Sequence, residues 1–228
     1  GYSQQETEYE LIDFVFLGMY DLLILRGDKS RQDSRFIPKE GGLQYASQLC
    51  AQVNDFNDGR LLYGDTHDML QENRFSYGVA GYPEKHYQAG DLATDIRHLK
   101  EKVDAGCDFL TTQMFFDNNL FYNFLFKIRE KGITVPILPG IMPITTAKVV
   151  ERAISLSGSL VPQRFKSLLD RFGTDADAMK QAGIAYATDQ IIDLFANGIY
   201  HVHVYTMNKP DVAQSILHNV SDILGKAL

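Results

Sequence analysis

Tryptophan is absent from this sequence, cysteine occurs only twice, and basic residues form no block. Cys50 and Cys107 lack the short Cys/His spacings of a structural zinc site and are too few for a disulfide framework. Such sparse cysteine is typical of a reducing compartment, so we expect a cytoplasmic protein without a metal site. The 22 Lys and Arg residues are outnumbered by 29 Asp and Glu residues, which argues against a phosphate-neutralising surface for nucleic acid.

Long apolar runs are also missing. No stretch approaches the roughly 18 consecutive apolar residues of a membrane-spanning helix, and the first residues do not form the basic and then apolar pattern of a secretion signal. The sequence does supply 228 residues, of which 45% are hydrophobic, and this is enough to bury the core of one α/β domain. We therefore expect one domain over residues 1–228 that enters neither a membrane nor the secretory route.

Short apolar runs alternate with stretches of helical periodicity, which is the pattern of helices around a parallel sheet buried on both faces. Five strands are expected, at Asp21–Leu25, Tyr77–Gly81, Phe109–Thr112, Val135–Leu138 and His201–Tyr205. The expected helices cover roughly 3–17, 43–53, 91–106 and 118–132, followed by a helical excursion over 145–197 and a last helix with Val212, Ile216, Leu217 and Val220 on its apolar face. The polar segment 54–75 is interpreted as a surface excursion.

The ends of these elements carry recognisable signals. Ser3 and Glu6 have the spacing of a helix capping box, and Asn118 is expected to cap its helix. Asp175 and Asp177 suit another helix start. Pro139 with Gly140 is expected to end the fourth strand.

A helix before the first strand has no strand to follow, although in a βα array every helix should follow one. Five parallel strands could also form an open doubly wound sheet, but the first strand lacks the G-x-G-x-x-G turn of a dinucleotide-binding fold. The pattern therefore favours a (β/α)8 TIM barrel of the α/β class. Its C-terminal five strand–helix units are present, and its first three strands are expected to be missing.

Each expected strand ends in a polar or conformationally special cluster. In a barrel these clusters share the C-terminal face, where barrel enzymes place their active sites. The alternative is that they are ordinary strand ends, because polar residues are common there in any α/β fold. The clusters are Arg26-Gly27-Asp28, Tyr82-Pro83-Glu84, Gln113, Pro139-Gly140, and Thr206 with Asn208.

The segments LRGD, GYPEKHYQAGD, TTQMFFD, VPILPGIMPIT and HVYTMN occur in one order and spacing, and in these segments the chain resembles methylenetetrahydrofolate reductases over nearly its whole length. The resemblance implies a homo-oligomeric barrel enzyme that holds FAD, takes reducing equivalents from NAD(P)H and converts 5,10-methylenetetrahydrofolate into 5-methyltetrahydrofolate. It also implies that the chain matches barrel strands four to eight. The family's general acid, a glutamate on the first barrel strand, would then precede Gly1. We therefore expect these 228 residues alone to be inactive.

The resemblance implies that Arg26, Gly27 and Asp28 lie beside the flavin, with Asp28 as the catalytic residue that influences the ring and stabilises positive charge on the folate. On LRGD alone, Asp28 could be a loop acid or a helix cap, and Gly27 a plain turn glycine. Further flavin contacts are implied for Tyr45, Ala46, Tyr82, His86 and Ala89. Without the resemblance, the simplest interpretation is that Tyr45 packs within its helix and that His86 is a surface histidine.

Asp95, His98 and Lys102 are spaced so that they lie along one stripe of the following helix. A solvated face is the simplest interpretation of such a stripe. The resemblance instead implies that it holds the ribityl and diphosphate parts of FAD, with Lys102 as the cation and Asp95 as a hydroxyl acceptor. The bacterial pattern has asparagine in place of His98 and arginine in place of Glu101, so a phosphate contact at Glu101 is not expected.

Folate contacts are implied for Asp28, Gln113, Tyr205 and Lys209. The Gln113 amide can both donate and accept hydrogen bonds, which suits a pterin ring or a nicotinamide carboxamide. If the folate and the nicotinamide nucleotide occupy this one site in turn, the kinetics should be ping-pong. A buried glutamine that ties down a loop is the alternative. The family often has arginine at the position of Lys209 and glutamine at that of Val149, so the bidentate contact of an arginine is lost here.

Two rivals to this hypothesis remain. A non-catalytic barrel fragment or binding module would keep the scaffold without the chemistry. A barrel lyase or aldolase would need a buried lysine at the end of a strand, and no expected strand ends in one.

Overall fold

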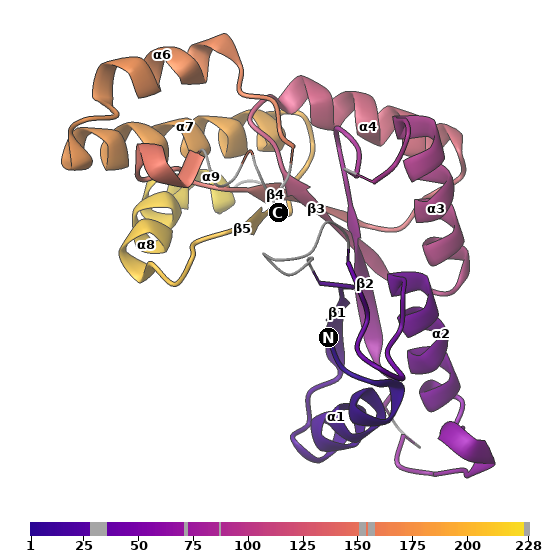
Figure 1. Ribbon diagram of the computed structural model, residues 1–228. Helices are drawn as coiled ribbons and strands as arrows, with labels where there is room; N and C mark the ends of the chain where they lie inside the picture. The colour runs from indigo at the N-terminus through magenta and orange to yellow at the C-terminus, as the bar shows by residue number, and fades with distance from the viewer. Residues whose placement is uncertain (28–35, 71–72, 87, 151–153, 155–157, 226–228) are drawn as a thin grey trace. The chain divides into compact units, whose positions relative to one another are not determined.

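The computed structural model describes residues 1–27, 36–70, 73–86, 88–150, 154 and 158–225 (Figure 1). Asp28 therefore lies outside the described residues. Five strands form a sheet in the order β1-β2-β3-β4-β5. They are β1 Asp21–Ile24, β2 Ser76–Gly81, β3 Phe109–Met114, β4 Ile137–Ile141 and β5 His203–Val204.

The printed strand pairings are parallel. In the first, Asp21 of β1 pairs with Ser76 of β2. In the second, Gly140 of β4 pairs with His203 of β5. The five strands expected from the sequence are confirmed, and so is the α/β class with parallel strands.

Helices separate the strands, as the apolar periodicity predicts. They are α1 Gln4–Phe16, α2 Ala46–Asn57, α3 Leu92–Asp104, α4 Asn118–Glu130, α6 Gln163–Phe172, α7 Ala176–Ala196, α8 Pro210–Asn219 and α9 Ser221–Leu224, with a short 3-10 turn η1 at Leu62–Gly64. Within the described part of the chain, no helix combines the length and the apolar character that crossing a bilayer requires.

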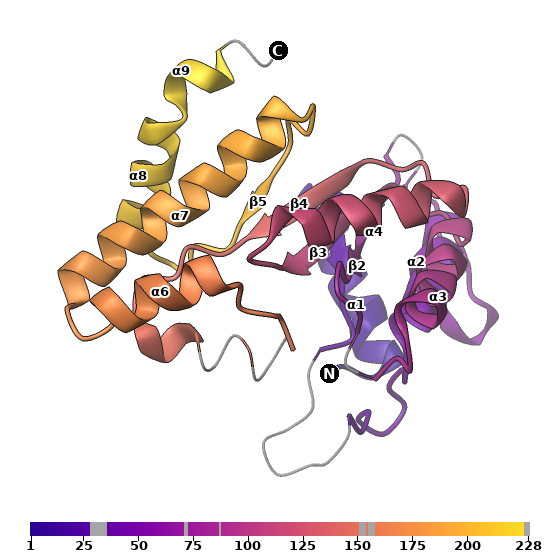
Figure 2. The ribbon, with the colours of Figure 1, turned by 90° about the horizontal axis from the view of Figure 1, so that it is seen from above.

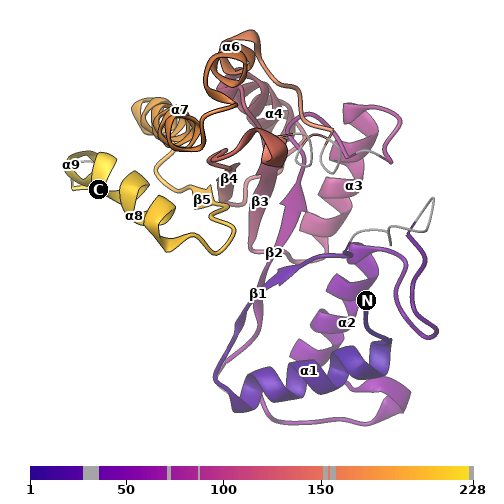
Figure 3. The same ribbon diagram turned by 60° about the vertical axis from the view of Figure 1, so that its left-hand side comes forward.

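The chain divides into two compact units. The first contains Gly1–Ala80 and Arg97–Leu110, and the second contains Gly81–Ile96 and Thr111–Leu228. In the first unit the predicted capping box is present, because the Ser3 N–H donates to Glu6 Oε2 over 2.8 Å and the Glu6 N–H donates to Ser3 Oγ over 3.2 Å. Helix α1 packs against α2 (Figure 3).

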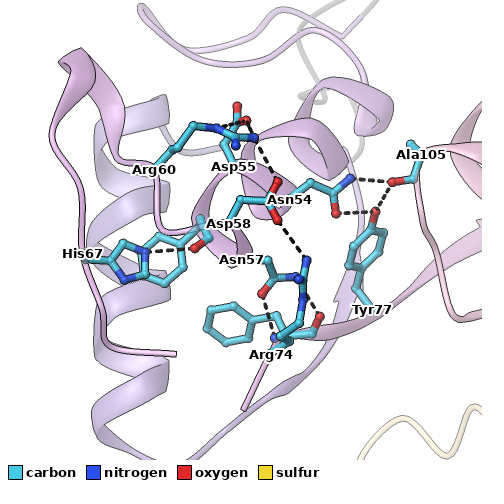
Figure 4. A network of polar contacts seen from close by, with 11 residues as sticks. Asn54, Asp55, Asn57, Asp58, Arg60, His67, Arg74, Tyr77 and Ala105 are labelled. Atoms are coloured by element: carbon cyan, nitrogen blue, oxygen red, sulfur yellow. Dashed lines mark hydrogen bonds and ion pairs between the residues drawn. The ribbon is translucent and has the colours of Figure 1, made fainter. Parts of the chain in front are cut away.

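The segment 54–75, interpreted as a surface excursion, is tied to the sheet by a polar network (Figure 4). Asn57 holds the backbone of Phe75 through two hydrogen bonds, of 2.8 and 3.0 Å. The Tyr77 hydroxyl lies 3.0 Å from Asn54 Oδ1 and 3.1 Å from the Ala105 carbonyl oxygen. Burial raises the pKa of Tyr77 to about 12, so this hydroxyl stays a neutral donor.

In the second unit, α7 lies between α6 and α8 (Figure 2). The cap of α7 is confirmed, because Asp175 accepts hydrogen bonds from the N–H groups of Asp177 and Ala178. Gly183 lets this helix touch the chain after β4, since a Cβ there would stand 1.8 Å from the Ile144 carbonyl oxygen. The apolar core of this unit contains Met114, Phe116, Met142, Ile144, Val150, Phe165 and Met179.

Several sequence-based details are wrong. Pro139 and Gly140 lie inside β4, because pairing with β5 keeps the backbone extended through them. Asp117, and not Asn118, is the N-cap of α4, and its carboxylate accepts from the Asn119 N–H. Leu217, expected on an apolar face, is 58% exposed.

Candidate active site

The loop between β2 and α3 is held in shape by its own polar groups. The Tyr82 and His86 rings meet edge to face, with centroids 4.7 Å apart. The His86 N–H donates to Asp95 Oδ2 over 2.9 Å, and the Ala89 N–H donates to the His86 carbonyl oxygen over 2.9 Å. The second unit therefore brings together four of the residues predicted to bind the flavin.

Glu84 lies in the same loop and was not predicted as a site residue. Its Oε2 accepts the Leu160 N–H over 2.8 Å, whereas its Oε1 is buried and has no hydrogen-bond partner among the residues that the structure describes. Burial raises the pKa of the Glu84 carboxyl, and the negative charge of Asp117 raises it further. The neighbouring Ser159 donates from its hydroxyl to the Met114 carbonyl oxygen over 3.0 Å. Glu84 and Ser159 thus attach the segment before α6 to the carboxyl ends of β2 and β3.

A second cluster lies at the carboxyl ends of β3, β4 and β5. Thr112 is fully buried, and its backbone oxygen accepts from the Tyr205 hydroxyl over 2.8 Å. The Thr112 hydroxyl oxygen accepts from the Gly140 N–H over 2.8 Å. Because Gly140 has no Cβ, the Tyr205 ring can lie against the backbone of β4: a Cβ would stand 2.6 Å from that ring. Burial raises the pKa of Tyr205, so its hydroxyl remains a donor.

The turn after β5 combines strain with a half-buried cation. Met207 and Asn208 adopt left-handed φ angles of 52° and 58°, which residues other than glycine seldom adopt and which gather at functional sites. Directly after them, the Lys209 ammonium donates to Thr145 Oγ1 over 2.7 Å. Tyr205 and Lys209, both predicted to contact substrate, therefore lie on one strand end and are each fixed by a buried threonine.

His203 is a further candidate that the sequence did not single out. It precedes Tyr205 on the same strand end, and the two rings meet edge to face with centroids 4.6 Å apart. Burial lowers the pKa of His203, which favours the neutral imidazole. Alternation along the strand places the two rings on one face, and this is the signal that could have identified it.

Comparison with known proteins gives the identity of the fold that carries these clusters. A family model described as methylenetetrahydrofolate reductase matches residues 2–221. The chain belongs to the methylenetetrahydrofolate reductase family. It is 37% identical over 207 residues to "Methylenetetrahydrofolate reductase 2" of Saccharomyces cerevisiae. The aligned region covers 90% of this chain and 32% of that protein.

Other relatives agree. The chain is 35% identical over 212 residues to "Methylenetetrahydrofolate reductase (NADH) 1" of Arabidopsis thaliana, covering 89% of this chain and 33% of the relative. It thus spans about a third of the length of both relatives. The chain is also similar in fold to a solved structure, with a TM-score of 0.56 and 15% identity over 98% of this chain and 69% of that one. That structure is described as an uncharacterized protein from Clostridium thermocellum that binds two copies of 5-methyl-5,6,7,8-tetrahydrofolic acid.

The first unit contains the other flavin residues that the resemblance to methylenetetrahydrofolate reductases implies. Gly27 has a φ of +84°, and apart from its chain neighbours no atom of the described residues lies within 4 Å of where its Cβ would stand. The Arg26 guanidinium lies over the Phe36 ring, 4.8 Å from its centroid. Tyr45 is 58% exposed and directly precedes Ala46, the first residue of α2. A left-handed φ is a backbone conformation that glycine adopts without strain, so it explains the glycine at this position with or without a ligand.

Helix α3 presents the predicted stripe away from its buried residues. Ile96 and Leu99 are buried, whereas Asp95 and Lys102 are half-buried and His98 is exposed. The Lys102 ammonium donates to the Ala80 carbonyl oxygen over 2.9 Å, at the end of β2. Lys102 is therefore placed beside the strand end, while the exposure of His98 also fits a solvated face.

Gln113 and Val149 complete the positions taken from the methylenetetrahydrofolate reductase pattern. Gln113 is half-buried on β3, and its Oε1 accepts the Met114 N–H over 2.9 Å. Its amide nitrogen has no hydrogen-bond partner among the described residues, so it retains donors for a ligand. Val149 packs against the apolar core of the second unit, which is compatible with valine where the family often has glutamine.

A hollow in the first unit lies away from these strand ends. It has a volume of about 500 Å³ and is lined by residues at the amino ends of β2 and β3, including Asn54, Asn57, Arg74, Tyr77 and Asp108. Most of its polar groups already bond one another: Asn54 with Tyr77, Asn57 with Phe75, and Arg74 with Asp58 (Figure 4). This arrangement is that of a structural network, and we place no catalytic role there.

Proposed function

We propose that the protein takes part in the flavin-dependent reduction of 5,10-methylenetetrahydrofolate to 5-methyltetrahydrofolate, with NAD(P)H as the reductant. The observation that carries this proposal is the family match over residues 2–221. Support comes from the fixed donors at the strand ends of the second unit, Tyr205 and Lys209. We also propose that the strands belong to a (β/α)8 barrel, whose carboxyl strand ends would share one catalytic face.

Each unit, taken by itself, offers groups that suit a flavin. In the first unit Gly27 has a left-handed backbone, and in the second the edge-to-face pair of Tyr82 and His86 offers rings to a flat aromatic group. Lys102 would supply a cation for the diphosphate, and Asp95 an acceptor for the ribityl hydroxyls. When bound, FAD supplies a carrier that accepts a hydride from NAD(P)H and gives it to the folate.

The chain's own side chains would bind and orient the folate. The Gln113 amide is suited to the pterin ring or the nicotinamide carboxamide, because it donates and accepts at one point. Tyr205 would present its ring, because its hydroxyl already donates to the Thr112 carbonyl oxygen, and Lys209 would attract an anionic group. Asp28 is proposed to stabilise positive charge as it develops on the folate. The homo-oligomer and the cytoplasmic location stay predictions.

The flavin assignment is tested by the visible spectrum of the purified full-length protein. We expect a yellow protein that binds FAD in titration. Its absorbance near 450 nm, roughly where oxidised flavins absorb, should be lost when NADH or NADPH is added without oxygen. A colourless protein that binds no FAD would refute the proposal. Flavin binding together with folate binding but without turnover would instead favour the binding-module alternative.

A further inference from the structure

We propose that Thr145 is a positioning residue, which fixes the ammonium of Lys209 before substrate binds and so sets the affinity of the folate site. The inference rests on the proposed function, because it treats Lys209 as a substrate contact. Thr145 lies in PGIMPITT, after β4, and Lys209 follows β5, so the contact joins residues 64 positions apart. Neither the motif nor the predicted contacts assign a role to Thr145.

The contact itself is short and shielded. The Lys209 Nζ donates to Thr145 Oγ1 over 2.7 Å, and Thr145 is only 5% exposed. Since a charged donor bonds more strongly than a neutral one, this bond is among those that contribute most to local order. It uses one of the three N–H donors of the ammonium and leaves two for a substrate.

The side chain of Lys209 does not cap the helix that it begins. Lys209 is the N-cap of α8 and makes no capping hydrogen bond through its side chain. Lysine is a poor residue for that position, because a cation is disfavoured at the positive end of a helix dipole. The two preceding residues, Met207 and Asn208, are in the left-handed region. The chain thus accepts two local costs to place a cation here.

Within the described part of the chain, no acid neutralises the charge of Lys209. Among the described residues no carboxylate forms an ion pair with it, and Asp211, the acid nearest in sequence, pairs with Lys180. Thr145 is a neutral acceptor, so it orients the ammonium without cancelling its charge. A free lysine side chain loses about 2 kcal/mol of rotamer entropy when it is fixed, and holding it in advance moves that cost from binding to folding.

The consequence is a defect in affinity and not in chemistry. Thr145→Val has nearly the same shape but no acceptor, so we expect KM and the Kd for the folate to rise about tenfold, by loss of a charged hydrogen bond, while kcat stays within about twofold. Thr145→Ser keeps the hydroxyl and should restore the affinity of the native protein. Thr146→Val is the matched control, because Thr146 is the adjacent threonine and is exposed.

The deciding experiment is a double-mutant cycle with Lys209→Met in the full-length holoenzyme. Calorimetric titration with 5-methyltetrahydrofolate gives Kd, and steady-state assays give KM and kcat. In the Lys209→Met background, Thr145→Val should add no further loss. Equal losses in both backgrounds, a Thr145→Ser variant as weak as Thr145→Val, or an unchanged KM in Thr145→Val would each overturn the inference.

A melting curve is recorded for each variant. If Thr145→Val does not fold, Thr145→Ala replaces it in the same cycle, because it removes the same acceptor with a smaller side chain.

Failure of the proposed function can be distinguished from failure of the positioning role of Thr145. A native protein that neither binds nor reduces the folate refutes the proposed function, and this inference with it. A native protein that turns over normally beside an unaffected Thr145→Val variant refutes the positioning role alone.

Discussion

Gly140 offers a sharp test of the packing at the strand ends, because a single methyl group has no room there. In Gly140→Ala the new Cβ would stand 2.2 Å from the Thr112 carbonyl oxygen and 2.6 Å from the Tyr205 ring. The first neighbour is backbone and cannot rotate away, so β4 must move and the Gly140 N–H bond to Thr112 Oγ1 is strained with it. We expect a loss of about 3 kcal/mol, at the upper end of ordinary overpacking.

That loss corresponds to a fall in Tm of roughly 6 to 12 °C for a chain of this size. The folate affinity should fall as well, since the displaced ring is that of Tyr205. The matched control is Gly90→Ala, because nothing lies within 4 Å of a Cβ at Gly90, and its Tm should change by less than about 2 °C. Differential scanning calorimetry on the three proteins decides the matter. A Gly140→Ala protein that melts with the native one would refute the close approach of β3, β4 and Tyr205.

Three further predictions concern single side chains. Burial raises the pKa of Glu84, so this carboxyl favours folding most below its ordinary pKa, and that contribution is lost as the pH rises through the raised pKa. The Tm of Glu84→Gln should therefore rise relative to that of the native protein between about pH 4 and pH 7. The same Tm difference at both pH values would contradict this. Asp28→Asn should keep FAD but shift its potential and slow the folate half-reaction in stopped-flow experiments, whereas unchanged half-reactions would leave Asp28 a loop acid. Lys102→Met should weaken FAD binding in a fluorescence titration more than the exposed His98→Ala does, and equal affinities would remove Lys102 from the flavin site.

Local sequence signals predicted most of the fold. Apolar periodicity located the five strands, and the capping box at Ser3 and the acidic cap at Asp175 began their helices as expected. The error at Pro139 and Gly140 has a tertiary cause. These residues punctuate a chain locally, but the pairing with β5 holds them in β4.

The sequence suggested residues for a candidate site, but it did not predict their long-range contacts. The bond from Leu160 to Glu84 spans 76 positions, and that from Lys209 to Thr145 spans 64. No period or motif reports such pairs, because they depend on how strand ends meet. Strand alternation could have paired His203 with Tyr205, but the edge-to-face contact of the two rings is known only from the structure.

The most direct measurement of the proposed activity is a single turnover without oxygen. The flavin of the purified holoenzyme is reduced with NADH or NADPH, excess nucleotide is removed, and 5,10-methylenetetrahydrofolate is added while the absorbance and the folate products are followed. We predict that flavin absorbance returns and that one 5-methyltetrahydrofolate forms for each reduced flavin, as the two halves of a ping-pong reaction require. A reduced flavin that stays bleached, with no 5-methyltetrahydrofolate formed, would contradict the assignment of this chain to folate reduction.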